Sequence, residues 1–283
     1  MRPLSLAISV VAVTAIVLAC SGAPDAARAP HKGRFSGAAA WRLLEWQVEL
    51  GPRPAGSPAS RRLARRLKRL LPHGHYERVP GGLRNVVGTI PGTSRRYVVV
   101  GAHYDTKDLP GFVGANDGAS GTAVLTQLAR TIKPHKLRRS IVFVAFDGEE
   151  SPAGVPDDEF VKKGLRGSKV AARHFRRARA MVLLDFVGDK HLHIAREEFS
   201  NPRLWRELRQ AARAVGAGST FPRRVGGGVF DDHTPFEDRG IPSIDLIDFD
   251  FPCFHRPCDD LHAVSERSID RVGETMVRFL ASL

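Results

Sequence analysis

Apolar and polar positions along the chain form a pattern that predicts buried strands separated by amphipathic helices. Uninterrupted apolar runs, typical of strands buried on both faces, occupy residues 97–102, 141–146 and 181–184. Further strands are predicted at residues 85–90, 190–195 and 241–247, and helices at 38–50, 57–71, 167–179, 201–215 and 265–280, with another that ends at residue 132. This alternation predicts an α/β three-layer sandwich, in which helices cover both faces of a mostly parallel central sheet. We expect a single domain over residues 38–283.

Acidic residues and histidines follow these strands at the points where the strands end. His103 and Asp105 come after the strand at 97–102, residues 147–150 (Asp-Gly-Glu-Glu) after the strand at 141–146, and Asp185 after the strand at 181–184. Asp117 and His255 lie in loops that follow strands. Because open α/β sheets bind ligands at the carboxyl ends of their strands, these residues are candidates for one site.

The residue types in this set indicate a metal centre. Nitrogen and oxygen donors without cysteine are typical of zinc sites that keep a position open for water or substrate. In the pair Glu149–Glu150, one carboxylate can bind the cation while the other transfers a proton. Taken singly, each residue also has a structural explanation: a packed histidine, a helix cap, a turn residue or a surface histidine. Their joint placement favours the metal centre.

The first 37 residues have the composition of a targeting segment rather than of a folded domain. Arg2 precedes an apolar stretch from Leu4 to Leu18, and Ala19-Cys20 follows it. Residues 1–20 resemble a bacterial lipoprotein signal, in which Cys20 carries the lipid, although ordinary secretion with cleavage nearby is an alternative. Residues 21–37, rich in Ala, Pro and Gly, are predicted to form a flexible tether. We therefore expect an exported protein that lies in the periplasm or at the cell surface and is anchored by a lipid on Cys20.

Charge and cysteine content narrow the possible partners. The formal net charge is +13, but the basic residues are dispersed and no nucleic-acid-binding motif accompanies them. We expect no nucleic-acid partner, no membrane contact other than the lipid, and a monomer. Cys253 and Cys258 flank His255 and could form a local disulfide in an oxidising compartment or remain free thiols.

From about residue 85 to the C-terminus the chain resembles the zinc aminopeptidase and glutaminyl cyclase family, metallopeptidase family 28. The matching motifs are His103-x-Asp105, residues 114–117 with 119–121, residues 147–150, Leu-Leu-Asp185 and His255-x-Pro257-x-Asp259. The resemblance implies one or two zinc ions, with His103, Asp117, Glu150, Asp185 and His255 as ligands. It also implies that Asp105 lies behind His103 and that Glu149 is the catalytic acid/base. In the one-zinc cyclases only the equivalents of Asp117, Glu150 and His255 bind the metal.

Two enzymatic activities within this family compete, both acting on peptides or proteins with a free N-terminus. A cyclase converts an N-terminal glutamine into pyroglutamate, whereas an aminopeptidase hydrolyses the first peptide bond. Residues 231–236 and 239–242 resemble the cyclases, in which Asp231 would join Glu149 and Asp185 in a proton network; alternatively, Asp231 caps the following helix. Phe251 and Phe254 are candidate pocket residues, although cyclases carry tryptophan at the position of Phe254. We favour the cyclase over the aminopeptidase, and either enzyme over a non-catalytic binding protein.

Overall fold

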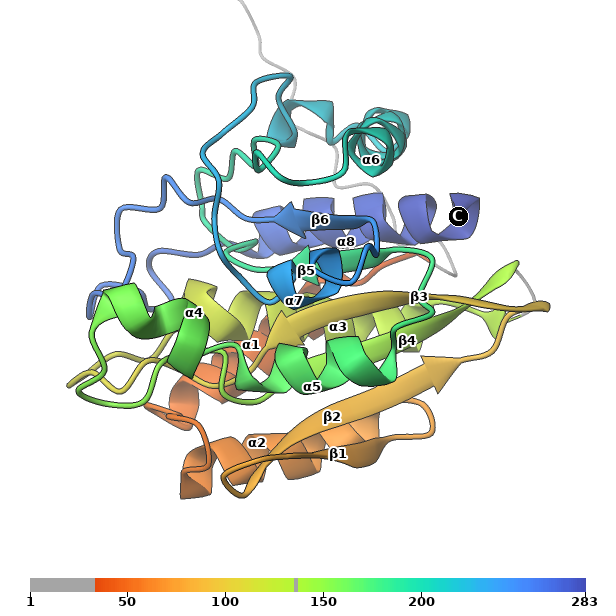
Figure 1. The fold of residues 1–283 in the computed structure, drawn as a ribbon. Helices are drawn as coiled ribbons and strands as arrows, with labels where there is room; N and C mark the ends of the chain where they lie inside the picture. The colour runs from red at the N-terminus through yellow and green to blue at the C-terminus, as the bar shows by residue number, and fades with distance from the viewer. Residues whose placement is uncertain (1–33, 135–136) are drawn as a thin grey trace, which may run out of the picture. The chain divides into compact units, whose positions relative to one another are not determined.

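A mixed sheet of six strands forms the centre of the molecule (Figure 1). The computed structural model describes residues 34–134 and 137–283. The strands lie in the order β1-β2-β4-β3-β5-β6, and their bounds are β1 His75–Val79, β2 Leu83–Ile90, β3 Ser94–His103, β4 Arg139–Phe146, β5 Met181–Leu184 and β6 Ser243–Leu246. Strands β4, β3, β5 and β6 are parallel, whereas β1 and β2 pair antiparallel at one edge.

The strand register places the carboxyl ends of the parallel strands side by side. His103 at the end of β3 pairs with Phe146 at the end of β4. Strand β5 pairs with the middle of β3 through Gly101 and Leu183, so the residue after β5 lies at the same edge of the sheet. Side chains alternate between the two faces because successive residues of a strand point in opposite directions. The candidate ligands at the ends of β3, β4 and β5 therefore meet because of the register rather than because of their sequence spacing.

Helices cover both faces of the sheet. The helices are α1 Gly37–Glu49, α2 Pro58–Leu70, α3 Gly121–Thr131, α4 Phe160–Lys163, α5 Arg166–His174, α6 Pro202–Ala214, α7 Thr234–Glu237 and α8 Glu266–Ser282, with shorter turns at η1 Ala115–Ser120, η3 Asp157–Glu159 and η4 Gly218–Thr220. The larger core cluster joins one face of the sheet to α1, α2, α3, α6 and α8, and a smaller cluster joins the other face to α5 and α7. These layers confirm the predicted three-layer α/β fold.

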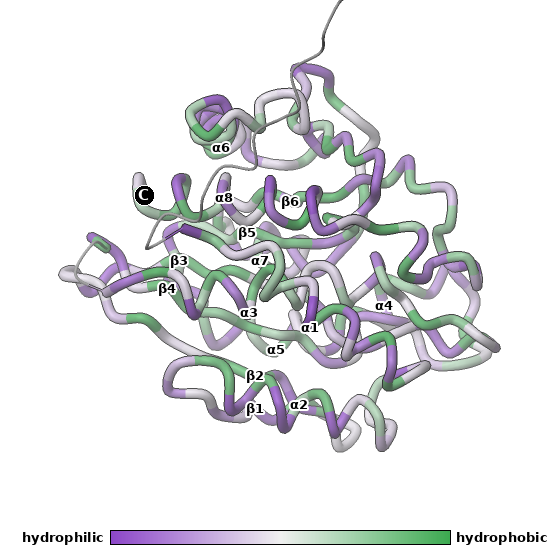
Figure 2. Tube along the Cα trace, turned by 180° about the vertical axis from the view of Figure 1, so that it is seen from behind, coloured by the Kyte–Doolittle hydropathy of each residue, from purple (hydrophilic) through white to green (hydrophobic). Residues whose placement is uncertain are grey.

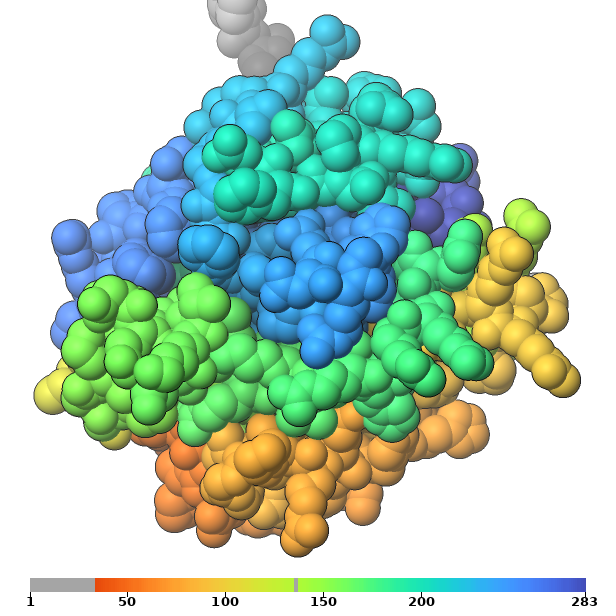
Figure 3. Space-filling view, viewed as in Figure 1, coloured from red at the N-terminus to blue at the C-terminus, as the bar shows by residue number. Residues whose placement is uncertain are grey.

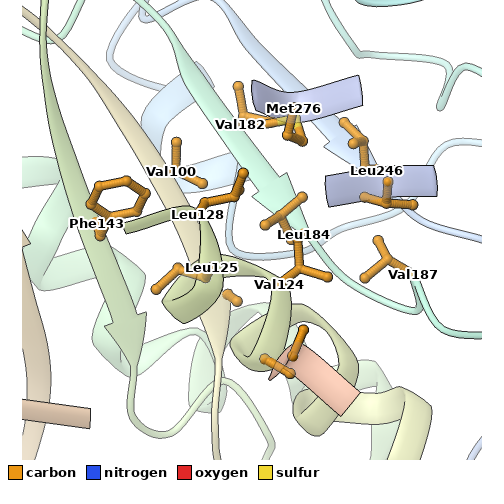
Figure 4. Packing of buried hydrophobic residues seen from close by; sticks show 14 of the residues in the cluster. Val100, Val124, Leu125, Leu128, Phe143, Val182, Leu184, Val187, Leu246 and Met276 are labelled. Carbon is orange, nitrogen blue, oxygen red and sulfur yellow. The ribbon is translucent and has the colours of Figure 1, made fainter. Parts of the chain in front are cut away.

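The core packing follows from the apolar runs of the central strands. Figure 4 shows Val100 and Phe143 of the sheet packed against Leu125 and Leu128 of α3, with Met276 of α8 nearby. In Figure 2 the central strands are coloured mostly as hydrophobic, whereas α2 alternates between hydrophobic and hydrophilic positions. This alternation reflects the one-sided burial of an amphipathic surface helix.

Two predicted elements differ from the structure. Residues 190–195 do not form a strand: Leu192 N donates to Asp189 O in a turn, and His193 N donates to the Asp248 carboxylate rather than to a neighbouring strand. Helix α5 ends at His174 and not at residue 179. Arg179 N donates to Tyr97 O of β3, so the backbone must leave the helix before it enters the sheet. Strand β1, a largely polar edge strand, was not predicted.

The predicted signal segment and Cys20 lie outside the described residues, as does most of the predicted tether. Its last residues belong to the folded unit, because Phe35 is buried against Gly273 of α8 and the Ser36 side chain accepts a hydrogen bond from Ala39 N at the start of α1. The predicted end of the tether at residue 37 is therefore too late. Over residues 34–134 and 137–283, no helix combines the length and apolarity needed to cross a membrane.

A disulfide links Cys253 to Cys258 and decides the question that the sequence left open. It closes the short loop that carries His255, whose backbone adopts a left-handed conformation with φ of 50°. Non-glycine residues rarely adopt this conformation, and they keep it where the surrounding structure imposes it. The disulfide is one such constraint on His255.

Candidate metal centre and active-site cavity

The structure brings the five predicted metal ligands together in two groups that share Asp117. The first group contains His103, Asp117 and Asp185, and the second contains Asp117, Glu150 and His255; in each group the ligand atoms lie within 4.8 Å of one another. His103 Nε2 lies 3.2 Å from Asp117 Oδ1 and 3.3 Å from Asp185 Oδ1. His255 Nε2 lies 3.5 Å from both Asp117 Oδ2 and Glu150 Oε1. Asp117 is thus placed to contact two cations or one.

The second group fits a divalent cation. Asp117 Oδ2 and Glu150 Oε1 are buried and accept no hydrogen bond from the described residues. Buried carboxylate oxygens normally have a partner, and these two unpartnered oxygens face the same imidazole nitrogen. One nitrogen and two oxygen donors form the type of set that binds zinc with an open position.

Asp105 lies behind His103, as the resemblance implies, but its carboxylate mainly holds the loop after β4. Its Oδ1 accepts hydrogen bonds from Gly148 N at 2.9 Å and Glu149 N at 3.2 Å, and its Oδ2 accepts one from Glu150 N at 3.3 Å. The His103 imidazole donates through Nδ1 to the backbone carbonyl of Asp105 at 3.1 Å, while the carboxylate is 3.8 Å away. Asp105 therefore fixes both His103 and the two glutamates.

The turn η1 aims the carboxylate of Asp117 and needs glycine at position 118. Gly118 has φ of +86°, and a Cβ there would lie 2.7 Å from the Asp105 carbonyl oxygen. The Asp259 carboxylate accepts hydrogen bonds from Asn116 N at 2.7 Å and Asp117 N at 3.0 Å. The sequence pattern gives Asp259 no such role, although Asp259 belongs to the motif that contains His255.

Arg53 is a buried cation beneath the centre, and sequence reasoning missed it. Its guanidinium donates to the carbonyls of Gln47, Gly51, Val113 and Gly114. Burial lowers its pKa to about 10, so it remains charged at neutral pH. The nearby carboxylates of Asp259, Asp117 and Asp105 offset this burial, and the single sequence contains no signal for this arrangement.

A cavity of about 330 Å³ opens beside the second ligand group. Its lining residues combine a carboxylate wall with an aromatic wall and are Lys107, Asp117, Glu149, Glu150, Asp157, Phe160, Asp185, Phe186, Gly228, Val229, Phe230, Asp231, Ile247, Phe249, Phe254 and His255. The loop around α4 forms one side of the cavity, and it lies against the segments that follow β6 (Figure 3). Part of the long loop after Glu150 is therefore a wall of the cavity, through Asp157 and Phe160.

Glu149 and Asp231 are buried in this cavity without being members of the second ligand group. Burial, and then the charge of Glu150, raises the pKa of Glu149 well above its usual value. Burial and the charge of Asp245 raise the pKa of Asp231 in the same direction. Groups with raised pKa values in a cavity can hold and transfer protons near neutral pH.

Asp231 does not cap the helix that follows it. One carboxylate oxygen accepts a hydrogen bond from the adjacent Asp232 N, and the other accepts none from the described residues. Helix α7 has His233 at its N-cap position and no side-chain cap. The alternative that Asp231 caps this helix is therefore wrong.

One of the two predicted pocket aromatics lines the cavity and the other does not. The Phe254 ring stacks on His255 with centroids 3.8 Å apart. Phe251 is buried and packs against Phe186 with ring centroids 5.9 Å apart, so Phe186 lies at the cavity wall in its place. The prediction for Phe251 is wrong because the backbone turns its ring toward the core.

Asp232 provides a test of the buried charge. Burial raises its pKa from 3.8 to about 7, so in the folded metal-free protein it keeps its proton to a higher pH than in the unfolded chain. The contribution of this group to the free energy of unfolding is therefore fully present below about pH 4 and is lost as the pH rises through about 7. Between these two pH values the free energy of unfolding falls by about 1.4 kcal/mol for each pH unit. We expect Asp232→Asn to raise the Tm of the metal-free protein more near pH 8 than near pH 5. An equal change at both pH values, measured by thermal denaturation, would contradict the raised pKa.

Comparison with known proteins agrees with the geometry. The profile of Peptidase family M28 matches residues 85–280, which include every ligand described above. The chain belongs to peptidase family M28. This confirms the resemblance inferred from the motifs and supports the prediction of an enzyme.

M28 relatives of both kinds match the chain. It is 30% identical to the glutaminyl-peptide cyclotransferase of Bos taurus, over 83% of this chain and 80% of that protein. It is 29% identical to the aminopeptidase YwaD of Bacillus subtilis over 62% of this chain, but this match spans only 39% of the Bacillus protein. Among solved structures, an Acidobacteriales glutaminyl cyclase matches with a TM-score of 0.75 and 29% identity, over 91% of this chain and 98% of that one.

Proposed function

We propose that this protein is a zinc-dependent glutaminyl-peptide cyclotransferase, which converts the N-terminal glutamine of a peptide or protein into pyroglutamate and releases ammonia. The observation that carries the proposal is the placement of Asp231. This buried carboxylate lines the same cavity as Glu149 and Asp185, and it does not cap a helix. The similarity to named cyclases supports the same activity.

The proposed metal ligands are Asp117, Glu150 and His255. Zinc bound there would polarise the side-chain amide of the substrate glutamine. Lys107 Nζ lies 3.7 Å from Glu150 Oε2, and this contact leaves the unpartnered Oε1 as the ligand atom. The stacked ring of Phe254 holds the plane of the His255 imidazole.

Glu149 is proposed to transfer the proton during cyclisation. The α-amine nitrogen bonds to the side-chain carbonyl carbon, and the bond from that carbon to the amide nitrogen breaks. Glu149 accepts the proton that the amine loses and donates it to the departing ammonia, which its raised pKa favours. Because the reaction is intramolecular, the cavity walls need only hold the glutamine side chain folded back on its own amine. Asp185 and Asp231, which line the same cavity, are proposed to join Glu149 in the network that carries this proton.

Product analysis tests this function. Purified, zinc-loaded protein is incubated with one Gln-initiated and one Leu-initiated peptide of otherwise identical sequence, and the products are read by mass spectrometry. We expect loss of ammonia from the Gln peptide and no change in the Leu peptide. Release of the first residue from either peptide would contradict the cyclase activity.

An aminopeptidase activity is the second candidate, because the structure contains a second possible ligand group. His103, Asp117 and Asp185 could hold another cation, and Asp117 would then bridge the two ions. In such an enzyme Glu149 would take a proton from water, and a free amino acid would be the product.

Metal content distinguishes these candidates at the level of single residues. We expect elemental analysis to find one zinc per chain, with His255→Gln losing it and His103→Gln retaining it, because only His255 belongs to the proposed cyclase site. Two zinc ions in the parent, falling to one in His103→Gln, would favour the aminopeptidase. Circular dichroism of both variants controls for folding.

We also propose that the protein is exported and held at the membrane by a lipid on Cys20. The Cys253–Cys258 disulfide supports an oxidising compartment. We expect Cys20→Ala to move the protein from the membrane fraction to the soluble fraction of the cells that export it. An unchanged membrane fraction would contradict the lipid anchor.

A further inference from the structure

Exposed large apolar side chains gather around one region of the described surface. Phe230, Phe249 and Phe254 are 57%, 52% and 38% exposed and stand at the mouth of the active-site cavity. The other exposed large apolar side chains of the described residues are Phe199, Val225 and Val161. The Phe199 ring lies over Gly228, Val225 precedes the glycine run 226–228, and Val161 follows Phe160 of the cavity wall. A rimmed apolar patch of this kind marks a binding surface.

A second hollow of about 330 Å³ adjoins the active-site cavity on this side. The two hollows share Gly228, Val229, Ile247 and Phe249, so these residues form the partition between them. Residues 226–228 are all glycine and line the second hollow. A Cβ added at Gly227 would meet no atom within 4 Å, which shows that side-chain space is left open there.

The polar side chains around the second hollow already have partners. The Glu197 carboxylate accepts hydrogen bonds from Phe199 N, Ser200 N and Val229 N. Asp248 accepts one from His193 N at 2.7 Å, and Arg224 pairs with Asp250 at 2.6 Å. What remains available to a ligand is therefore mainly the ring of Phe249, Ile247, Val229 and the glycine backbone.

We propose that the second hollow binds the side chain of the residue that follows the N-terminal residue of the substrate, and that it selects a large apolar or aromatic side chain. This inference rests on the proposed function, because it takes the carboxylate-lined cavity as the site of the first residue. Consecutive Cα atoms are about 3.8 Å apart, so the residue after the first lies at the edge of the cavity, next to Phe249 of the partition. Aromatic rings exposed at such a position gain contact area only when a substrate covers them.

The test compares two peptides that differ only in their second residue, Gln-Phe and Gln-Gly at the N-terminus. We expect kcat/KM to be roughly tenfold higher for the Gln-Phe peptide in the parent enzyme. Phe249→Ala removes the shared ring, and Gly227→Leu adds a large side chain to the lining of the hollow without a positive φ to oppose it; both are expected to bring this ratio close to one. Arg61→Met, a change at an exposed residue of α2 that lines neither hollow, should keep the parent ratio.

Equilibrium binding separates failure of this proposal from failure of the proposed function. The affinities of the same two peptides are measured by calorimetry with zinc-loaded Glu149→Gln, so no turnover is required. A Gln-Phe preference that Phe249→Ala abolishes would support the subsite even if no ammonia were released. Ammonia release with no preference in the parent, or with a preference that survives both Phe249→Ala and Gly227→Leu, would overturn the subsite and leave the cyclase activity intact.

Discussion

Replacing Glu149 with Gln is expected to lower kcat by about 10²–10⁴-fold while the zinc content stays unchanged. The amide has nearly the same shape as the carboxylate but cannot accept the proton that the amine must lose. Glu149 is buried in the cavity, and Asp105 fixes its backbone N–H, so the substituted side chain should remain in place. Steady-state kinetics with a Gln-initiated peptide and elemental analysis of the same sample make the measurement.

Glu159→Gln is the matched control, because Glu159 lies in the same loop region but outside the cavity lining. Its activity should equal that of the parent. Activity in Glu149→Gln within a factor of two or so of the parent would show that another group transfers the proton, and Asp231 would be the next candidate.

Replacing Arg53 with Met is expected to lower the free energy of unfolding by about 3–5 kcal/mol, which is the usual loss when one partner of a buried ionic network is removed. The substitution removes the guanidinium hydrogen bonds to the carbonyls of Gln47, Val113 and Gly114, of which Gln47 and Gly114 keep a backbone donor. It also removes the cation that offsets the charge of Asp117 and Asp259. Urea denaturation of the metal-free protein gives this difference.

Arg61→Met is the control for loss of an arginine, because Arg61 is exposed on α2 and should change stability by less than about 0.5 kcal/mol. Equal stability of Arg53→Met and Arg61→Met would contradict the structural role of the buried guanidinium. Zinc should partly restore the stability of Arg53→Met, since a bound cation replaces part of the lost positive charge.

The predictable part of this protein is the part encoded by local pattern. The apolar runs 97–102, 141–146 and 181–184 are typical of buried strands, and a histidine or an aspartate follows each of them. Once these strands are parallel neighbours, their carboxyl ends share one edge of the sheet, so the ligands meet without any further information. The family resemblance added the order of the motifs, the roles of the site residues and the two activities that compete.

The residues that sequence reasoning missed act through tertiary contacts. Arg53 follows a Gly-Pro turn and has no neighbour in sequence that reveals its burial beneath Asp117 and Asp259. Residues 190–195 have apolar positions at strand-like spacing, but their N–H groups do not donate to a neighbouring strand. They donate instead to the carbonyls of Asp189 and Thr220 and to the Asp248 carboxylate. Phe251 is buried against Phe186, and it is Phe186 that lines the cavity.

The origin of the oxygen atoms in the product tests the central claim most directly. The zinc-loaded protein is incubated with a Gln-initiated peptide in water enriched in heavy oxygen, and the products are analysed by mass spectrometry. Cyclisation uses the substrate's own amine as the nucleophile, so the account predicts a pyroglutamyl peptide that has lost ammonia and carries no heavy oxygen. A free amino acid whose carboxylate carries heavy oxygen would contradict the account, because it would show that water is the nucleophile and that the protein is a peptidase.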